Sequence, residues 1–380
     1  MILKKLSLLN YRNIESADLV FSDKISCFIG MNGEGKTNIL DSIFFLSFTK
    51  STASSQDSAN IRHGEDMMMV QGTYDLNGSE EVVSIGLKMH QKKSVKRNQK
   101  AYKKLSEHIG MFPLVIVSPR DSELIVGGSE ERRRFMDLVI SQYDAEYIGL
   151  LSSYNRALQQ RNSLLKAEEE PADDVISVYE DMMAMYGEMI FEKRSSFIEE
   201  LVPLFQKFYC AISGEGEEVG LLYTSHCQRG PLLDVIRRDR MKDRVMGDSL
   251  HGVHKDDLEM TLGGFPIKRE GSQGQSKTYL VALKLAQYYF LSLAGKKTAP
   301  LLLLDDIFDK LDSSRVENIV RLVSRAFADA DVKEMEQDIR SIGFYHNKAK
   351  NLIACARVLL ERCDGDYRLF RVSHGRIVTL

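Results

Sequence analysis

The chain has 380 residues, and its 51 lysines and arginines against 54 aspartates and glutamates give a formal net charge of −3. This length provides for a large core in about two to three domains, and the charge excludes a general attraction to nucleic acid, so such contacts must come from local patches. The five cysteines form no C-x-x-C pair and favour free thiols, and no apolar segment is long enough to span a membrane, so we expect a cytoplasmic protein without a membrane partner.

The first predicted elements are short strands that lead into a glycine-rich loop. Residues 25–30, ISCFIG, have the composition of a strand, and the helix expected from Lys36 places four apolar residues on one face: Ile39, Leu40, Ile43 and Phe44. The loop matches G-x-x-x-x-G-K-[ST], in which backbone N–H groups and the helix N-terminus surround a phosphate, a lysine neutralises it and a hydroxyl binds Mg²⁺. A chance match is the alternative, but the flanking strand and helix disfavour it. The sequence therefore predicts a nucleotide site at Gly30, Met31, Asn32, Gly33, Glu34, Gly35, Lys36 and Thr37.

Further along, residues 67–90 predict a β-hairpin that turns at Asn77 and Gly78. The segment from Met89 to His108 that follows is dense in lysine and arginine. Charge of this density binds the nucleic-acid backbone without reading sequence, although a solvated lysine-rich hairpin is equally consistent with it. We predict a DNA contact at Lys92, Lys93, Lys96 and Arg97.

From about Ser129 the apolar spacing becomes helical, is broken by EEEPADD at residues 168–174, and resumes to Ser213. This pattern predicts two long helices that form an antiparallel hairpin and project as an arm. The arm domain would span 129–245, and the head domain would combine 1–128 with 246–380. At the base of the arm, Arg132, Arg133 and Arg134 either extend the basic surface or pair with Glu130 and Glu131.

Two motifs follow the arm. Ser272, Gln273, Gly274 and Gln275 precede a strongly amphipathic helix, where taken alone they make a good N-cap. Residues 299–312, APLLLLDDIFDKLD, predict a buried parallel strand that ends in carboxylates opposite the phosphate loop. Asp305 is then the metal-side carboxylate, and Asp306 orients or deprotonates the attacking water. The alternative is a buried strand capped by a solvated acidic turn.

The order of these motifs resembles the ABC class of ATPases, and the long helical interruption resembles the SMC-like ATPases and, among them, the RecF family. The resemblance covers residues 1 to about 325. Six separated segments carry it: NYRNIESADLVFS, IGMNGEGKTNILDSIFFLSFTKS, VSPRDSELIVGGSEERRRFMDLVISQY, LHGVHKDDLEM, GSQGQSKTYLVALKLAQ and LLLLDDIFDKLDSSRVENIV.

The RecF resemblance implies an α/β fold, an ABC-type ATPase head of the P-loop class with an inserted helical arm. It implies ATP and Mg²⁺ as cofactors, with Lys36, Asp305 and Asp306 catalytic and Thr37 and Asp305 at the metal. It also implies a homodimer that forms on ATP, in which the Ser-x-Gly-Gln turn of one copy caps the γ-phosphate held by the other, and a slow, DNA-stimulated hydrolysis that acts as a switch. Double-stranded and gapped DNA, RecO and RecR are the implied partners, and placing RecA on gapped, damaged DNA is the implied task.

Residues 328–366 depart from this pattern. Where the family has an apolar strand ending in a polar switch residue, the spacing here is helical, and residues 338–361, DIRSIGFYHNKAKNLIACARVLLE, resemble part of an endonuclease III-type DNA glycosylase. The catalytic lysine and aspartate and the iron–sulfur cysteines of that family have no counterpart, so we expect no glycosylase activity. RecF-like sequence resumes over 367–380. A missing strand and switch residue predict weaker hydrolysis and weaker ATP-driven dimerisation than the resemblance implies.

Three alternative functions remain open at this point. The chain could be a DNA-binding module whose ATP switch is impaired, the ATPase subunit of a transporter or another ABC assembly, or a phosphoryl-transfer kinase. The interrupting hairpin and the basic segment disfavour a transporter subunit, and a kinase has no need of the Ser-x-Gly-Gln turn.

Overall fold

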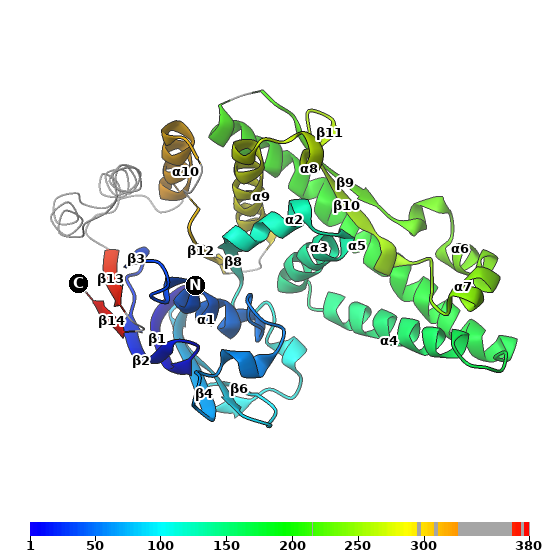
Figure 1. Ribbon diagram of the computed structural model, residues 1–380, viewed down its shortest axis with the longest axis horizontal. Coiled ribbons are helices and arrows are strands. Elements are labelled where there is room, and N and C mark those ends of the chain that lie inside the picture. The colour runs from blue at the N-terminus through cyan, green and yellow to red at the C-terminus, as the bar shows by residue number, and fades with distance from the viewer. Residues whose placement is uncertain (215, 295–297, 308–310, 326–366, 374–375, 380) are drawn as a thin grey trace. The chain divides into compact units, whose positions relative to one another are not determined.

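The computed structural model describes all residues except 215, 295–297, 308–310, 326–366, 374–375 and 380 (Figure 1). The chain forms two compact units, which are residues 1–119, 211–213 and 295–380, and residues 120–210 and 214–294. Segment 246–294, which the sequence assigned to the head, lies in the second unit, because its helix α9 (Gln273–Ala294) packs against α3 (Ser129–Tyr143).

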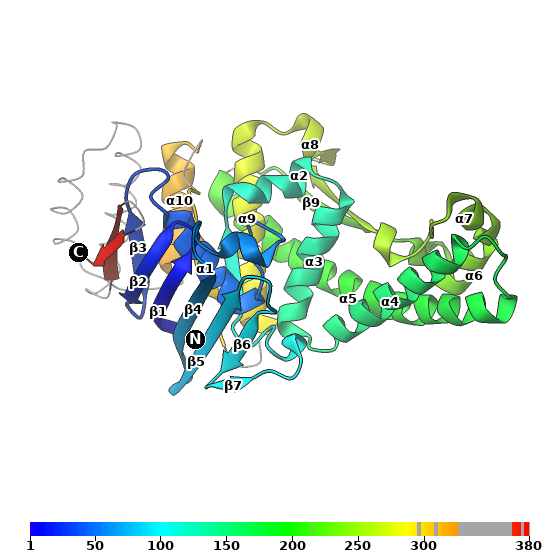
Figure 2. The same cartoon turned by 60° about the horizontal axis from the view of Figure 1, so that its bottom comes forward.

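The largest sheet of the first unit is antiparallel, in the order β2-β1-β4-β5-β6-β7 (Figure 2). Its strands are β1 (Ile2–Tyr11), β2 (Ile14–Val20), β4 (Met67–Leu76), β5 (Ser79–Lys88), β6 (Ser94–Arg97) and β7 (Lys100–Ala101). The predicted hairpin is confirmed, because β4 and β5 pair directly and Asn77 and Gly78 both adopt the positive φ of a two-residue turn.

Helix α1 (Lys36–Phe48) begins at the residue that the sequence predicted, but its burial differs from the prediction. All residues from Ile39 to Phe48 are buried, where one apolar face was expected. The reason is that α1 contacts the large sheet through β1, β4 and β5 and also contacts β8 (Leu114–Val117), so neither side of the helix faces water.

Two smaller sheets complete the first unit, together with α10 (Ser313–Arg325). One pairs β12 (Leu301–Leu304) with β8 in parallel, as predicted, and the other has the order β14-β13-β3, in which β3 (Ile25–Ile29) and β13 (Tyr367–Ser373) are parallel and β14 (Arg376–Thr379) is antiparallel. Among the described residues no strand joins β3 to β12. The β12 strand is only partly covered, since Leu303 is buried and its three neighbouring leucines are half-buried. The predictions for 328–366 lie outside the described residues.

The helical part of the second unit corrects the sequence prediction at one point. The first long helix is two helices, α3 and α4 (Tyr147–Leu165), because Asp144 adopts extended backbone angles and its carboxylate accepts the N–H of Glu146. The antiparallel hairpin therefore consists of α4 and α5 (Asp173–Ser213), which lie side by side in Figures 1 and 2. The other elements are α2 (Glu123–Val126), α6 (Leu232–Arg238), α7 (Arg240–Met246), α8 (Ile267–Glu270), β9 (Val219–Thr224), β10 (Asp257–Leu262) and β11 (Phe265–Pro266).

A buried ion cluster fastens α4, α5 and α7 together. The fully buried Arg161 of α4 donates to Glu180 of α5 at 3.1 Å, and to Asp243 of α7 and Ser249 at 2.7 Å each. Burial alone would raise the pKa of Glu180, but hydrogen bonds from Arg240 and the charge of Arg161 together lower that pKa. Every member of the cluster is thus paired, which a buried charge requires.

Neutral histidines near this cluster make the stability of the protein depend on pH. His254 Nδ1 accepts the hydroxyl of Tyr154 at 2.7 Å, and His226 Nδ1 accepts the N–H of Gly252 at 3.1 Å. Burial lowers the pKa of each of these two histidines to about 4, because the charged imidazolium would be poorly solvated there. Protonation would also occupy the ring nitrogen that accepts the hydrogen bond. The unfolded chain then binds more protons than the folded chain between these pKa values and the ordinary value near 6.5.

We therefore expect the melting temperature to be constant above about pH 6.5 and to fall steadily toward pH 4. Thermal unfolding followed by circular dichroism across pH 4–8 measures this. In His226→Gln/His254→Gln, which cannot be protonated at these positions, the slope over this window should be smaller. An equal slope in both proteins would contradict the assignment.

Candidate functional site

The glycine-rich loop between β3 and α1 has the backbone conformation that a phosphate cradle needs. Gly33 and Gly35 have φ values of 85° and 111°, in the region that favours glycine. A Cβ at Gly35 would also lie 2.9 Å from Oδ1 of Asn13, whose exposed side chain could move aside, so the positive φ is the main reason for glycine there. The loop ends at the N-terminus of α1, where the N-cap residue Gly35 makes no side-chain capping bond, and a helix N-terminus favours an anion.

Lys36 lies over this loop. Its ammonium donates to the carbonyls of Gly30 and Met31 at 2.7 Å each. These bonds hold the cation beside the same backbone that would surround the phosphates. A phosphate oxygen is a stronger acceptor for an ammonium than a neutral carbonyl. The lysine therefore stands where the β- and γ-phosphate charge is expected.

The loop and the LLLLDD motif meet at one point. Thr37 Oγ1 donates to Asp305 Oδ1 at 3.1 Å, although 268 positions separate the two residues. Asp305 lies here because it directly continues β12, and its N–H donates to the carbonyl of Val117 on β8. A hydroxyl and a carboxylate oxygen that converge in this way are ligands that Mg²⁺ prefers, so the residues fit the predicted metal.

Asp306 differs from its neighbour in conformation. It is exposed, and its φ of 48° places it in the left-handed region, which is uncommon for residues other than glycine. The extended conformation of β12 therefore does not continue through Asp306. Strained backbone of this kind often occurs at functional sites, and it agrees with separate tasks for the two aspartates.

A buried carboxylate on α1, which the sequence prediction missed, joins this helix to the end of β1 and to the segment that follows α1. Asp41 accepts from the hydroxyl of Tyr11 at 2.6 Å, and from the N–H and hydroxyl of Thr52 at 2.7 and 2.6 Å. Arg12 lies 3.2 Å from the same carboxylate and donates to Ser51 at 2.7 Å. The signal in the sequence was a single aspartate within the apolar run NILDSIFF.

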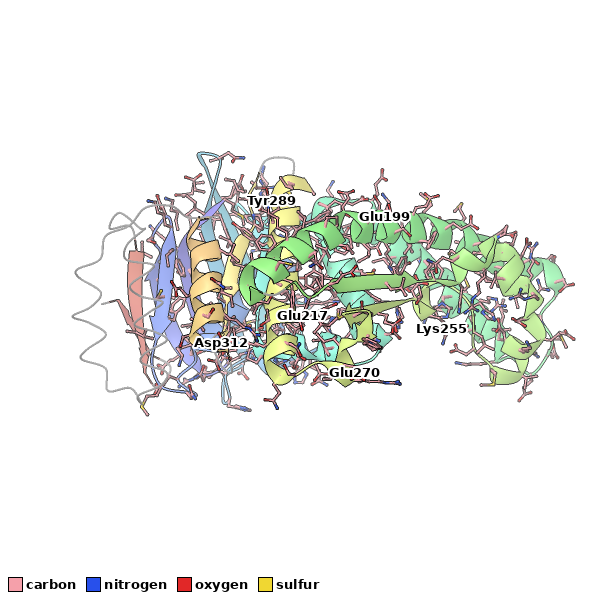
Figure 3. All side chains as sticks on the ribbon, turned by 90° about the horizontal axis from the view of Figure 1, so that it is seen from above. Glu199, Glu217, Lys255, Glu270, Tyr289 and Asp312 are labelled. Atoms are coloured by element: carbon pink, nitrogen blue, oxygen red, sulfur yellow. The ribbon has the colours of Figure 1, made fainter. Side chains whose placement is uncertain are left out.

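The Ser-x-Gly-Gln turn caps α9 in the second unit. Ser272 Oγ accepts the N–H of Gln275 at 3.2 Å, and the Gln275 side chain accepts the N–H of Ser272 at 2.9 Å, which is a reciprocal capping box. Gln275 also donates to Glu217, labelled in Figure 3, at 2.7 Å. The turn is therefore rigid, and Ser272 and Gln273 at its tip are exposed.

The predicted DNA-contact residues divide into two kinds. Lys92 and Lys96 are exposed, whereas Lys93 pairs with Asp57 and the carbonyl of Thr49, and Arg97 pairs with Glu81 at 2.8 Å. Three further lysines of this segment are exposed: Lys100, Lys103 and Lys104. The basic surface is thus made of lysines, while Arg97 links β6 to β5 and Lys93 links the β5–β6 connection to residues 49 and 57.

The arginines at the start of α3 have partners other than those considered from the sequence. Arg132 forms a two-pronged ion pair with Asp257, at 2.7 and 3.0 Å, and Arg133 donates to the carbonyl of Asp256 at 2.7 Å. They fix α3 to the beginning of β10. Neither forms an ion pair with Glu130 or Glu131, so the predicted pairing with those glutamates is not seen for Arg132 and Arg133, while Arg134 is exposed.

Three comparisons with known proteins agree on the family. A family described as RecF/RecN/SMC N terminal domain matches residues 2–332, and one described as HhH-GPD superfamily base excision DNA repair protein matches residues 309–377. The chain is 53% identical to the DNA replication and repair protein RecF of Bacteroides fragilis over 99% of this chain and 98% of that one. Two structures of the recombination mediator protein RecF in the RecFOR pathway, one with ATPrS and one with ATP, are 26% and 25% identical with TM-scores of 0.82 and 0.80, and each covers 100% of this chain and at least 98% of its own.

These comparisons confirm the predicted fold, an ABC-type ATPase head of the SMC kind, and the resemblance that six sequence segments carried. They also confirm that a segment near the C-terminal end, within residues 309–377, resembles a DNA glycosylase family. In the described part of the chain, no helix is both long and apolar enough to cross a membrane.

Proposed function

Because the chain belongs to the RecF family of DNA replication and repair proteins, we propose that it is an ATP-switched DNA-binding protein, two copies of which close around two ATP molecules. The observation that carries the proposal is the meeting of Lys36, Thr37 and Asp305 at the end of one glycine-rich loop. A cation, a hydroxyl and a carboxylate in this arrangement suit a nucleoside triphosphate with Mg²⁺.

In this proposal each part of the site has one task. Residues 30–36 would hold the phosphates, and Thr37 and Asp305 would supply oxygen ligands to a Mg²⁺ ion, which when bound would supply charge neutralisation for the phosphates. Asp306 orients the attacking water. The exposed tip of the capped turn at Ser272 meets the γ-phosphate held by the partner copy. Hydrolysis is slow and reopens the dimer.

The proposed setting is the cytoplasm, on double-stranded and gapped DNA. The similar structures with ATP belong to the RecFOR pathway, which supports RecO and RecR as partners and the placing of RecA at gaps as the task. The exposed lysines between residues 92 and 104 supply the contact with DNA phosphates.

Sedimentation velocity of the native chain tests the switch. In dilute solution we expect a predominantly monomeric chain without nucleotide and with ADP, and a dimer with ATP. A second candidate function, a DNA-binding module whose ATP switch is impaired, is favoured by the HhH-GPD match that begins at residue 309, just after Asp305 and Asp306. A chain that binds ATP but stays monomeric would support this second function and contradict the first.

Neutralising the exposed lysines should weaken DNA binding in a manner that depends on salt and not on sequence. In Lys92→Gln/Lys96→Gln we expect lower affinity for duplexes of any sequence, and a log–log salt slope about 2 smaller in magnitude, because each phosphate contact contributes about 0.9 to it. Fluorescence anisotropy at several salt concentrations measures both quantities.

The matched control is Lys5→Gln/Lys207→Gln, which removes the same charge from exposed positions outside the segment. It should leave the salt slope unchanged. If the two double variants behave alike, the DNA surface lies elsewhere. Lys93 and Arg97 are unsuitable for this test, because their ion pairs stabilise the fold.

A further inference from the structure

The outer face of α5 carries an apolar stripe that nothing in the second unit covers. Its members are Val175, Val178, Met182, Met185 and Met189, which we call the α5 stripe. Four of them are 39–54% exposed, and Met182 is half-buried. The opposite face of the same helix supplies the buried residues Ile176, Glu180, Met183 and Ile190. The stripe is therefore not an extension of the core.

The spacing of the α5 stripe is that of a coiled-coil seam. The intervals are three, four, three and four residues, so the five side chains occupy successive a and d positions over about 21 Å of helix. Single exposed apolar residues are ordinary on a protein surface, but a solvated helix face is normally polar. Beyond the stripe, exposed positions of α5 include the polar Ser196 and Glu199, the latter labelled in Figure 3, and among the described residues of α5 no large apolar side chain outside the stripe is exposed.

The residues that flank the stripe indicate the orientation of a matching helix. In a parallel pair each g position faces the e position five residues later on the other helix. This rule pairs Asp174 with Tyr179, Asp181 with Tyr186 and Glu188 with Lys193, which are two carboxylate–phenol pairs and one ion pair. In an antiparallel pair the three carboxylates would face one another instead and repel.

The in-chain partners of these residues leave this pairing possible. Asp181 accepts from Arg237 at 2.8 Å and remains 57% exposed, and Glu188 accepts the N–H of Leu232 at 3.0 Å. A carboxylate has about four acceptor sites, and the ammonium of Lys193, which pairs with Asp144, has three donors.

We propose that the α5 stripe binds the α5 stripe of a second copy of this chain, with the two helices parallel and in register. Such a contact has two-fold symmetry, so each seam residue meets its own counterpart, each flanking pair occurs twice, and the assembly closes as a dimer. With five seam residues the contact is small and weak. It needs no nucleotide and is separate from the ATP-dependent closure proposed above.

Disulfide trapping without nucleotide tests the pairing. Val178→Cys places a thiol at a seam position, and parallel in-register helices bring the two copies of it together. Under mild oxidation we expect a covalent dimer on a non-reducing gel, several-fold above the level of the unsubstituted chain, which retains the same native cysteines. Gln160→Cys, exposed on α4, is the matched control and should stay at the background level.

Two further variants make the result decisive. Adding Met185→Glu to Val178→Cys should abolish the covalent dimer, and the unchanged melting temperature expected for an exposed position shows that the fold is intact. Met182→Cys lies at the centre of the stripe and is trapped in either orientation. Trapping at residue 182 without trapping at 178 would show antiparallel helices and overturn the proposal, as would trapping at neither. Both outcomes leave the ATP-dependent dimer untouched, because no nucleotide is present.

Discussion

Lys36→Met is expected to lower the affinity for ATP by about 10- to 100-fold, because a hydrogen bond to a charged group contributes about 1.5–3 kcal/mol. Methionine keeps the length of the side chain but cannot neutralise the β- and γ-phosphates. In the free protein the substitution removes the hydrogen bonds that the Lys36 ammonium donates to the carbonyls of Gly30 and Met31, and these carbonyls belong to an accessible loop. The fold should therefore survive.

Isothermal titration with ATP and Mg²⁺ measures the affinity, and a thermal melt without nucleotide checks the fold. Lys50→Met is the control, since Lys50 is an exposed lysine just beyond the end of α1. It should bind ATP as the native chain does. ATP affinity that is unchanged in Lys36→Met would refute the phosphate-cradle interpretation.

Ser272→Arg is expected to abolish ATP-dependent dimerisation while leaving ATP binding by the monomer unchanged. The arginine would fill the exposed tip of the turn, where the proposal places the γ-phosphate held by the partner copy. Sedimentation velocity with ATP measures the dimer, and titration measures ATP binding.

Ser272→Ala separates this role from helix capping. The alanine removes the oxygen that accepts the Gln275 N–H, which costs about 1 kcal/mol of stability, but it adds no bulk at the tip. We expect a slightly lower melting temperature and a retained, weaker dimer. A Ser272→Arg chain that still dimerises with ATP would mean that Ser272 is only a helix cap.

The candidate phosphate site could be proposed from sequence because its residues are close together in the chain. The glycines, Lys36 and Thr37 are adjacent in the chain, and the strand before them and the helix after them follow from composition. Asp305 could be placed opposite the loop because a run of four leucines followed by a carboxylate has few other uses. The hairpin turn at Asn77 and Gly78 is similarly fixed by two residues.

The features that the sequence prediction missed have a common physical origin. In each case a side chain is engaged by polar partners that the sequence pattern does not reveal. Asp144 divides α3 from α4 through one hydrogen bond, although the apolar spacing runs through it. Asp41 collects partners from residues 11, 12, 51 and 52, which only the fold brings together. Lys93 and Arg97 have the same sequence character as Lys92 and Lys96, but carboxylates on neighbouring segments engage them.

The cluster of Arg161, Glu180 and Asp243 restricts the paths by which the arm can evolve. Removing one member leaves an uncompensated buried charge, which costs about 3–5 kcal/mol, whereas replacing the whole set with apolar residues is often neutral or better. A chain in which only one of these three residues has been replaced is therefore much less stable than the present chain. The three residues should therefore be inherited as a block, and an arm that has lost one of them should have lost all three.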